Sequence, residues 1–303
     1  MDAQVISQAV GNGDLDGIRK VLDFTPDIVS VISTASPAGF TPLARAVVQG
    51  HVDIVQYLLE AGADINVGYK TEWVDRTQHD LHPGLIENSP PLHCAAIKGS
   101  AELVRLLLLY GADANADNGS DRGSKVVPLH VATGEAVHAL ILAHADIDRE
   151  NNFGWTPLIY SISRQDIESI RVLVKHGAKV DTDRTTRYKV RVASGEEKLA
   201  LGTSSPLMVA CGHGRLTDQS ANIIEILAAA GADVNRRYTV ELGPEDGIPP
   251  SFTLLSLIYE SKSERPRVRS PHSTTEIKKW GQKELQVVAL LLQLGSDEND
   301  LIV

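Results

Sequence analysis

Apolar residues near the start of the chain fall three or four positions apart, which is the spacing of one face of a helix. Two such runs lie close together, at residues 43–47 and 54–59, and a glycine follows each of them, Gly50 and Gly62. Glycine ends helices readily because it adopts the left-handed conformation without strain. The pattern predicts two short helices, each with one buried face. A pair this short cannot bury both faces alone, so neighbouring pairs must stack.

A motif of the Gly-Ala-Asp type recurs at regular intervals. Its first residues are Gly62, Gly111, His144, Gly177, Gly231 and Gly295. The steps from Gly111 to His144 and from His144 to Gly177 are both 33 residues. A second motif, a proline followed by leucine, precedes most of these triplets, at Pro42, Pro91, Pro128, Pro157 and Pro206. A fixed period of this size indicates an array of structural repeats.

The residue before the proline is threonine or serine in three of these motifs, at Thr41, Thr156 and Ser205. Such a residue caps the start of a helix, and proline is tolerated in the first turn. The two linked motifs resemble those of the ankyrin repeat family. The resemblance implies an all-α solenoid of stacked helix pairs, with β-hairpin fingers between repeats and a concave recognition face.

The resemblance covers nearly the whole chain, as one domain with an amino-terminal cap at residues 2–23. The predicted repeats lie at about 39–66, 88–115, 126–148, 152–181, 204–235 and 251–297. Insertions separate or interrupt them at 67–87, 116–125, 182–203, 236–250 and 262–281. Loops this long are often functional. All finger insertions should project from one edge of the stack.

Several regions depart from the regular pattern. The third repeat has only 17 residues from Pro128 to Ala145, where three other repeats have 21, so its first helix must be cut short, whereas the fifth and sixth repeats are longer. The insertion at 182–203 alternates polar and apolar residues around Tyr188, which favours a β-hairpin that turns at Ser194-Gly195.

Charge is distributed unevenly along the 303 residues. Residues 1–150 hold 10 Lys and Arg against 20 Asp and Glu, whereas the remainder holds 19 of each. An acidic field favours a basic partner and disfavours nucleic acid. No apolar run approaches the about 20 residues that span a bilayer, and no secretory leader opens the chain. We therefore expect a cytoplasmic location, with the nucleus as the alternative.

The motifs of catalysis are missing from the sequence. It contains no nucleophile elbow, phosphate-binding loop or dinucleotide fingerprint, which predicts no catalytic residue and no cofactor. His79, Asp80 and His82 match no standard zinc spacing, so we expect no metal site. His93 and His130 follow the Pro-Leu pair of their repeats, and we expect them to bond backbone and tie neighbouring repeats together.

The resemblance also implies that partners contact the finger tips and the exposed ends of the first helices. The candidate partner-binding residues on these criteria, with one aromatic residue of the first insertion, are Phe40, Gln49, Trp73, Lys98, Trp155, Arg164, His213 and Phe252. Aromatic and arginine residues are common interface hot spots. Phe40 and Trp155 have a simpler interpretation as well, in which they pack neighbouring fingers together.

The sequence thus predicts a non-catalytic scaffold that binds a protein partner through its concave face. An unusual enzyme or small-molecule binder is the alternative. Its pocket would be walled by the insertions, with Trp73, His79, Tyr188, Trp155 and His213 around it. An adaptor subunit that works with a domain on another chain is a third interpretation.

Overall fold

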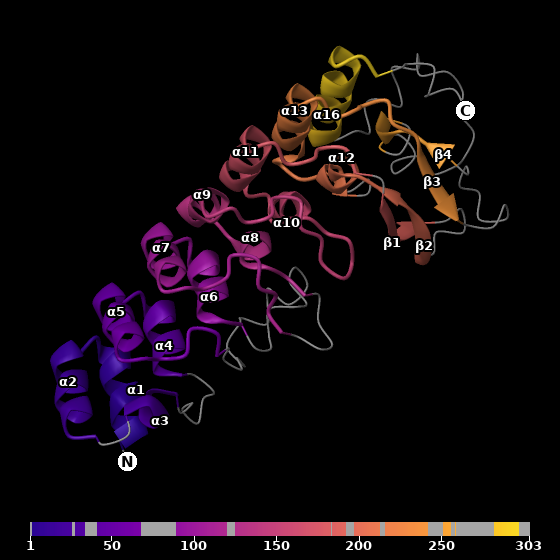
Figure 1. Ribbon diagram of the computed structural model, residues 1–303. Helices are drawn as coiled ribbons and strands as arrows, with labels where there is room; N and C mark the ends of the chain where they lie inside the picture. The colour runs from indigo at the N-terminus through magenta and orange to yellow at the C-terminus, as the bar shows by residue number, and fades with distance from the viewer. Residues whose placement is uncertain are drawn as a thin grey trace. The chain divides into compact units, whose positions relative to one another are not determined.

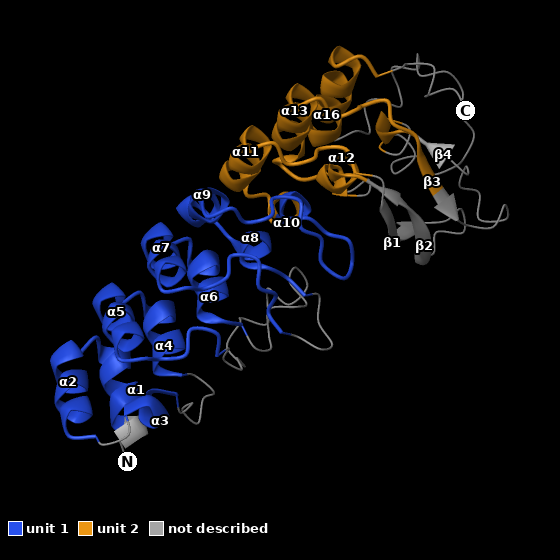
Figure 2. Ribbon diagram, viewed as in Figure 1, with its two compact units in different colours: residues 1–160 blue, residues 161–303 orange. Residues whose placement is uncertain are grey.

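The computed structural model describes residues 2–25, 28–33, 41–67, 89–119, 125–182, 184–191, 197–212, 216–241, 251–255, 258 and 282–296 (Figure 1). The chain divides into two compact units, residues 1–160 and 161–303 (Figure 2). The dividing line falls within helix α10, Pro157–Ser163. The two units are described separately below, and a single continuous stack of repeats stays a prediction.

Unit 1 is a series of helix pairs. Their bounds are α1 Asp2–Asn12 with α2 Leu15–Asp23, α4 Pro42–Gln49 with α5 Val52–Glu60, α6 Pro91–Lys98 with α7 Ala101–Leu109, and α8 Pro128–Val131 with α9 Glu135–Leu142. The first helices α1, α4, α6 and α8 pack one against the next and form the first-helix row, while α5, α7 and α9 do the same in the second-helix row (Figure 1). A further helix, α3 Ile28–Ser33, packs on α1 and α4.

The local chemistry of α4 shows why these residues form a helix. The Thr41 Oγ1 accepts a hydrogen bond from the Ala44 N–H at 3.2 Å, and Pro42 stands in the first turn. Gly50 ends the helix with a φ of +91°, a conformation that costs glycine little. The predicted apolar stripe of residues 43–47 is buried against its neighbours apart from Arg45. The region predicted as the amino-terminal cap, residues 2–23, forms helices α1 and α2, and the Asp14 Oδ1 caps α2 by accepting from the Gly17 N–H.

The third repeat is shortened as predicted, and the structure shows what replaces the missing turn. Helix α8 has four residues, and Ala132 then continues in extended conformation. The next residue, Thr133, reaches back to α6: its N–H donates to the Ala96 carbonyl and its Oγ1 to the Ile97 carbonyl, both at 3.1 Å. An extended segment therefore hydrogen-bonds to carbonyl groups in the last turn of the preceding first helix, where the Ala96 carbonyl also accepts from the Gly99 N–H at 3.1 Å.

Unit 2 holds the later repeats and a sheet. Its helices beyond α10 are α11 Ile167–Lys175, α12 Pro206–Ala210, α13 Ser220–Ala229 and α16 Gln282–Gln293, and residues 254–255 and 258 are also helical. Helix α13 packs against α11, α12 and α16. The strands are β1 Arg184–Arg191, β2 Glu197–Ser204, β3 Tyr238–Glu241 and β4 Ser251–Phe252, in the antiparallel order β1-β2-β3-β4.

The sheet joins two insertions that the sequence pattern treats as separate. The two strands of the predicted hairpin are confirmed, with Tyr188 opposite Ala200, whereas its predicted turn at Ser194-Gly195 lies outside the described residues. Strand β3 then pairs with β2 and with β4, which the sequence did not predict. The buried Tyr238 hydroxyl lies 2.6 Å from the Ser205 Oγ, the N-cap of α12, and hydrogen-bonds it. Burial raises the pKa of Tyr238, so this hydroxyl stays neutral.

Candidate partner-binding surface

Two buried histidines tie the repeats of unit 1 together. The His93 Nε2 donates to the Val126 carbonyl at 2.9 Å, which connects the second repeat to the third. The His130 Nε2 donates in the same way to the Trp155 carbonyl, also at 2.9 Å. Neither histidine is exposed to solvent, and burial lowers the pKa of each to about 4. Both rings are therefore neutral at pH 7, and their predicted structural role is confirmed.

The aspartates of the recurring triplet are structural as well. The Oδ1 of Asp64, Asp113, Asp146 and Asp233 accepts a hydrogen bond from the N–H two residues further on in each case. This is the bond by which aspartate holds a tight turn. These carboxylates therefore hold the turns of their repeats in shape.

The first helices of unit 1 end in an exposed surface that includes two predicted site residues, Gln49 and Lys98. Helix α4 ends with Val48 and Gln49, α6 ends with Ile97 and Lys98, and all four side chains are exposed. The Lys98 Nζ reaches across to the Val48 carbonyl at 3.0 Å. We call residues 48–49, 97–98 and 133 the helix-end surface. Packed helices and hydrogen bonds between repeats support this surface. Its backbone is therefore held in place before a partner binds.

Trp155 lies on a finger loop that is held in place by hydrogen bonds within unit 1. The Trp155 N–H donates to the Asn151 Oδ1 at 2.9 Å, and its carbonyl accepts from the Asn151 N–H at 3.0 Å. Its ring meets the Tyr160 ring edge-on, with centroids 5.4 Å apart, and the Asn151 Nδ2 donates to the Tyr160 hydroxyl. The residue is half-buried. Trp155 therefore packs within unit 1 and keeps part of its surface open; its partner-binding role stays a prediction.

The other predicted site residues are less informative. Arg164 is half-buried in the turn after α10. Phe252 lies in β4 opposite Tyr238, and only its backbone is described. Phe40, Trp73 and His213 lie outside the described residues, as do His79, Asp80 and His82. Of the eight candidates, the structure therefore brings together Gln49 and Lys98.

The sequence analysis missed Thr133 and Arg45, which border the same row of helices. Thr133 adds to the helix-end surface because the shortened repeat brings it back over α6. Arg45 is half-buried, and its Nη1 donates to the Ser7 Oγ at 3.1 Å. Repeat alignment does not signal either contact, since both depend on side chains that bridge between neighbouring pairs.

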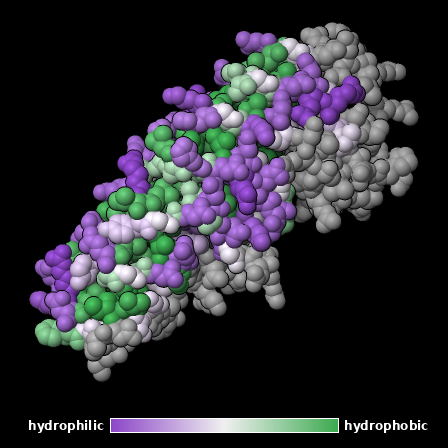
Figure 3. Space-filling view, in the orientation of Figure 1, coloured by the Kyte–Doolittle hydropathy of each residue, from purple (hydrophilic) through white to green (hydrophobic). Residues whose placement is uncertain are grey.

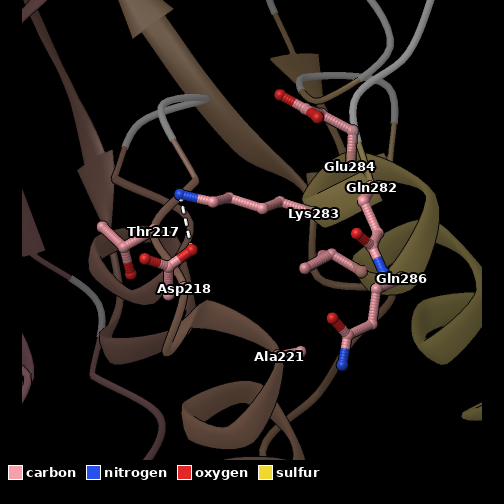
Figure 4. Close-up of a pocket in the computed structure, with 8 residues that line it drawn as sticks. Thr217, Asp218, Ala221, Gln282, Lys283, Glu284 and Gln286 are labelled. Atoms are coloured by element: carbon pink, nitrogen blue, oxygen red, sulfur yellow. Dashed lines mark ion pairs between the residues drawn. The ribbon is translucent and has the colours of Figure 1, made fainter.

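A pocket of about 420 Å³ lies in unit 2 between the amino-terminal ends of α13 and α16 (Figure 4). It is lined by Thr217, Asp218, Ala221, Gln282, Lys283, Glu284, Gln286 and Val287. The Lys283 Nζ and an Asp218 carboxylate oxygen lie 2.6 Å apart across it, but the two side chains are 49% and 80% exposed. Exposed ion pairs are weak and well hydrated. The pocket shares no residue with the one that the alternative interpretation proposed.

Within the described parts of the chain, no group of three acidic, histidine or cysteine side chains is placed to hold a metal. Both cysteines, Cys94 and Cys211, are buried, and neither forms a disulfide. Burial raises the pKa of the Cys211 thiol to about 12, which removes the thiolate that nucleophilic chemistry needs. No helix in the described ranges is long and apolar enough to cross a bilayer.

Comparison with protein families decides the fold. The model of a single ankyrin repeat matches residues 38–70 and 88–119, and a model of three ankyrin repeats matches residues 129–238. Together these matches cover more than half of the chain. The chain belongs to the ankyrin repeat family. Ankyrin repeats generally serve as protein–protein interaction modules, and proteins of the family are generally not enzymes.

Known ankyrin proteins resemble the chain over parts of their length. The Ankyrin repeat protein nuc-2 of Neurospora crassa is 30% identical over 55% of the chain, which spans 14% of that protein. The Nuclear factor NF-kappa-B p105 subunit of Gallus gallus is 25% identical over 71% of the chain and 19% of that protein. The crystal structure of the human ASB11 ankyrin repeat domain matches 96% of the chain and 98% of that domain with a TM-score of 0.58 at 20% identity, which supports the fold alone.

Proposed function

We propose that the chain is a non-catalytic scaffold that binds a protein partner through the helix-end surface of unit 1. The observation that supports this most directly is a repeated one. Two consecutive first helices present an apolar and a polar residue side by side, Val48 with Gln49 and Ile97 with Lys98. Exposed apolar residues beside hydrogen-bonding groups are the composition of a recognition surface.

The backbone under this surface is fixed by contacts that a partner would not need to supply. Lys98 and Thr133 each donate to carbonyls of a neighbouring repeat. The buried His93 connects the second repeat to the third by donating to the Val126 carbonyl. Because binding then orders little of the scaffold, more of the interaction energy appears as affinity. Trp155, fastened on its finger by Asn151, extends the proposed contact area along unit 1.

The partner in this proposal is basic, and the complex forms in the cytoplasm or nucleus. Residues 1–150 carry 10 positive against 20 negative side chains. A field of that sign attracts a basic protein over about 10 Å at moderate salt and repels nucleic acid. Association should therefore slow as salt rises, whereas dissociation should change little.

Capture of the partner from the native host, followed by titration, tests the proposal. The double variant Val48→Glu with Ile97→Glu should weaken binding by about tenfold or more without a change in thermal stability, because both side chains are exposed. The control, Gln56→Glu with Leu285→Glu, adds the same charge on exposed second helices. Equal affinities for the two double variants would refute the helix-end surface.

A further inference from the structure

The second helices carry one exposed position at which two neighbouring repeats differ from all the others. It lies two residues before the triplet, and its occupants along the chain are Glu60, Leu109, Leu142, Lys175, Ala229 and Gln293, all exposed. In the second and third repeats it is leucine, with exposed fractions of 80% for Leu109 and 63% for Leu142. Large apolar side chains so exposed at one repeated position call for an explanation.

The two leucines are neighbours. Helices α7 and α9 pack side by side, and the turns that follow them are fastened together (Figure 1). The Asn115 Oδ1 accepts from the Asp146 N–H at 2.8 Å. Tyr110, beside Leu109 and partly exposed, extends the surface towards α5, since its hydroxyl donates to the Glu60 Oε1 at 3.2 Å. Figure 3 shows hydrophobic residues over α7 and α9. We call Leu109, Tyr110 and Leu142 the outer leucine patch.

The fold does not require leucine at this position. Charged residues occupy it in other repeats, at Glu60 and Lys175, and these are exposed as well. A leucine that is 80% exposed gains little from burial within its own chain. The patch is therefore a feature of two repeats and not of the architecture.

Charge around the patch selects the kind of occupant. Helices α5, α7 and α9 contain four carboxylates and one arginine, Arg105. The exposed acidic residues of these three helices and of the turns that follow them include Glu60, Asp64, Glu102, Asp113, Glu135 and Asp146, which we call the acidic border. We propose that the outer leucine patch docks an amphipathic helix of a partner, whose apolar face covers the leucines and whose lysine and arginine residues meet the acidic border. This is a second surface, on the helices opposite to those of the proposed function.

A second copy of the chain does not fit this surface. Two such patches facing each other would oppose acidic borders, and like charges across an interface are costly. Two leucines and a tyrosine also expose far less than the about 800 Å² that each partner buries in a stable complex. A single docked helix, with apolar residues three or four positions apart, is the occupant that the size and charge favour.

The test uses defined probes and the whole chain. A short helical peptide made only of leucine and lysine, in an amphipathic pattern, is titrated calorimetrically against the wild type, and the bound amides are mapped by chemical shift. The patch variant is Leu109→Gln with Leu142→Gln, which adopts the residue found naturally at Gln293. The control variant is Val5→Gln with Val29→Gln, which removes two exposed apolar residues that lie outside both surfaces.

We expect the leucine–lysine peptide to bind the wild type, to shift the amides of α7 and α9, and to bind the patch variant about tenfold less tightly. The control variant should bind as the wild type does, and a leucine–glutamate peptide should not bind. Equal losses in both variants, binding of the acidic peptide, or a wild-type dimer that the patch variant dissolves would each overturn the proposal. None of these outcomes depends on the partner of the helix-end surface.

Discussion

The second and third repeats of unit 1, residues 88–115 and 126–148, share a Pro-Leu-His motif but build their first helices differently. In the second repeat, α6 has eight residues and ends at Gly99 in the left-handed conformation. In the third, α8 has four, and Thr133 covers the carbonyls of α6. A Cβ on Gly99 would lie 3.0 Å from the Thr133 Oγ1, so the full helix leaves room for the short one. A repeat can thus lose a helical turn when the segment that replaces the turn donates its hydrogen bonds to the preceding repeat.

The histidines of these two repeats differ in how many of their ring nitrogens are hydrogen-bonded. The His130 Nδ1 accepts from the Val127 N–H at 3.1 Å, so both of its nitrogens are bonded. The His93 Nδ1 has no hydrogen-bond partner among the described residues. The reason is the residue three positions earlier, where Pro90 has no N–H to give. The repeat with the full helix has the less satisfied histidine.

The largest expected effect is a loss of stability in acid that the two histidines share. Their pKa of about 4 lies below the usual 6.5 because both are buried. The unfolded chain therefore binds protons more readily, and the free energy of unfolding should fall from pH 6.5 down to pH 4, by about 3 kcal/mol for each histidine. Urea unfolding at a series of pH values measures this.

Replacement by glutamine keeps a donor at each histidine but removes its titration. His93→Gln and His130→Gln should each remove about half of that acid loss. An unchanged pH dependence in both variants would assign the loss to carboxylates instead.

The next largest expected effect is a difference in stability between the two histidine-to-alanine variants. His130→Ala leaves the buried Val127 N–H without its acceptor, whereas the Val126 carbonyl that His93 contacts still accepts from the Asn118 N–H. We expect His130→Ala to lower the free energy of unfolding by about 1–2 kcal/mol more than His93→Ala, since a stranded buried donor is costly. Denaturant unfolding at pH 7 compares them. An equal or larger loss in His93→Ala would contradict this account of Pro90.

The shorter helix should also open more often. A four-residue helix has few internal hydrogen bonds, so amides of residues 126–148 should exchange with deuterium roughly ten times faster than those of residues 91–115. Thr133→Val removes the hydroxyl that caps Ile97 and should widen the difference. Equal protection of the two repeats in the wild type would mean that the Thr133 segment fully replaces the missing turn.

Local chemistry made most of the helix pairs predictable. Thr41 with Pro42 sets where α4 begins, and Gly50 sets where it ends. The shortened third repeat was visible as missing residues. The contacts between distant segments were not, because they follow no local signal. Strand β3 pairs with β2 across 38 to 40 residues of sequence, and pattern alone gives no register for such a pair.

The candidate site was harder to predict for a related reason. The expected aromatic residues were chosen by residue type, and Trp155 proves to hold a ring contact and three backbone hydrogen bonds within unit 1. Burial separates a packing residue from a binding one, and sequence does not give burial. Leu109 and Leu142 could have been found by comparing each position across repeats, because leucine stands there where other repeats have charged residues, glutamine or alanine.

The smallest predicted effect concerns the end of the third repeat, and sequence alone points to it. The second repeat has Gly111 at the start of its triplet, with a φ of +93°, whereas the third has His144 in the same left-handed region with a φ of +60°. The left-handed conformation costs a residue with a Cβ about 1–2 kcal/mol. His144→Gly should therefore stabilise the chain by about 0.5–1 kcal/mol, because the greater freedom of glycine in the unfolded chain offsets part of the gain. Gly111→His should destabilise it by a similar amount, since its Cβ would meet no atom within 4 Å and only the backbone penalty would remain. Thermal unfolding of the two variants measures both changes, and a loss of stability in His144→Gly would show that the exposed histidine side chain contributes more than its backbone strain costs.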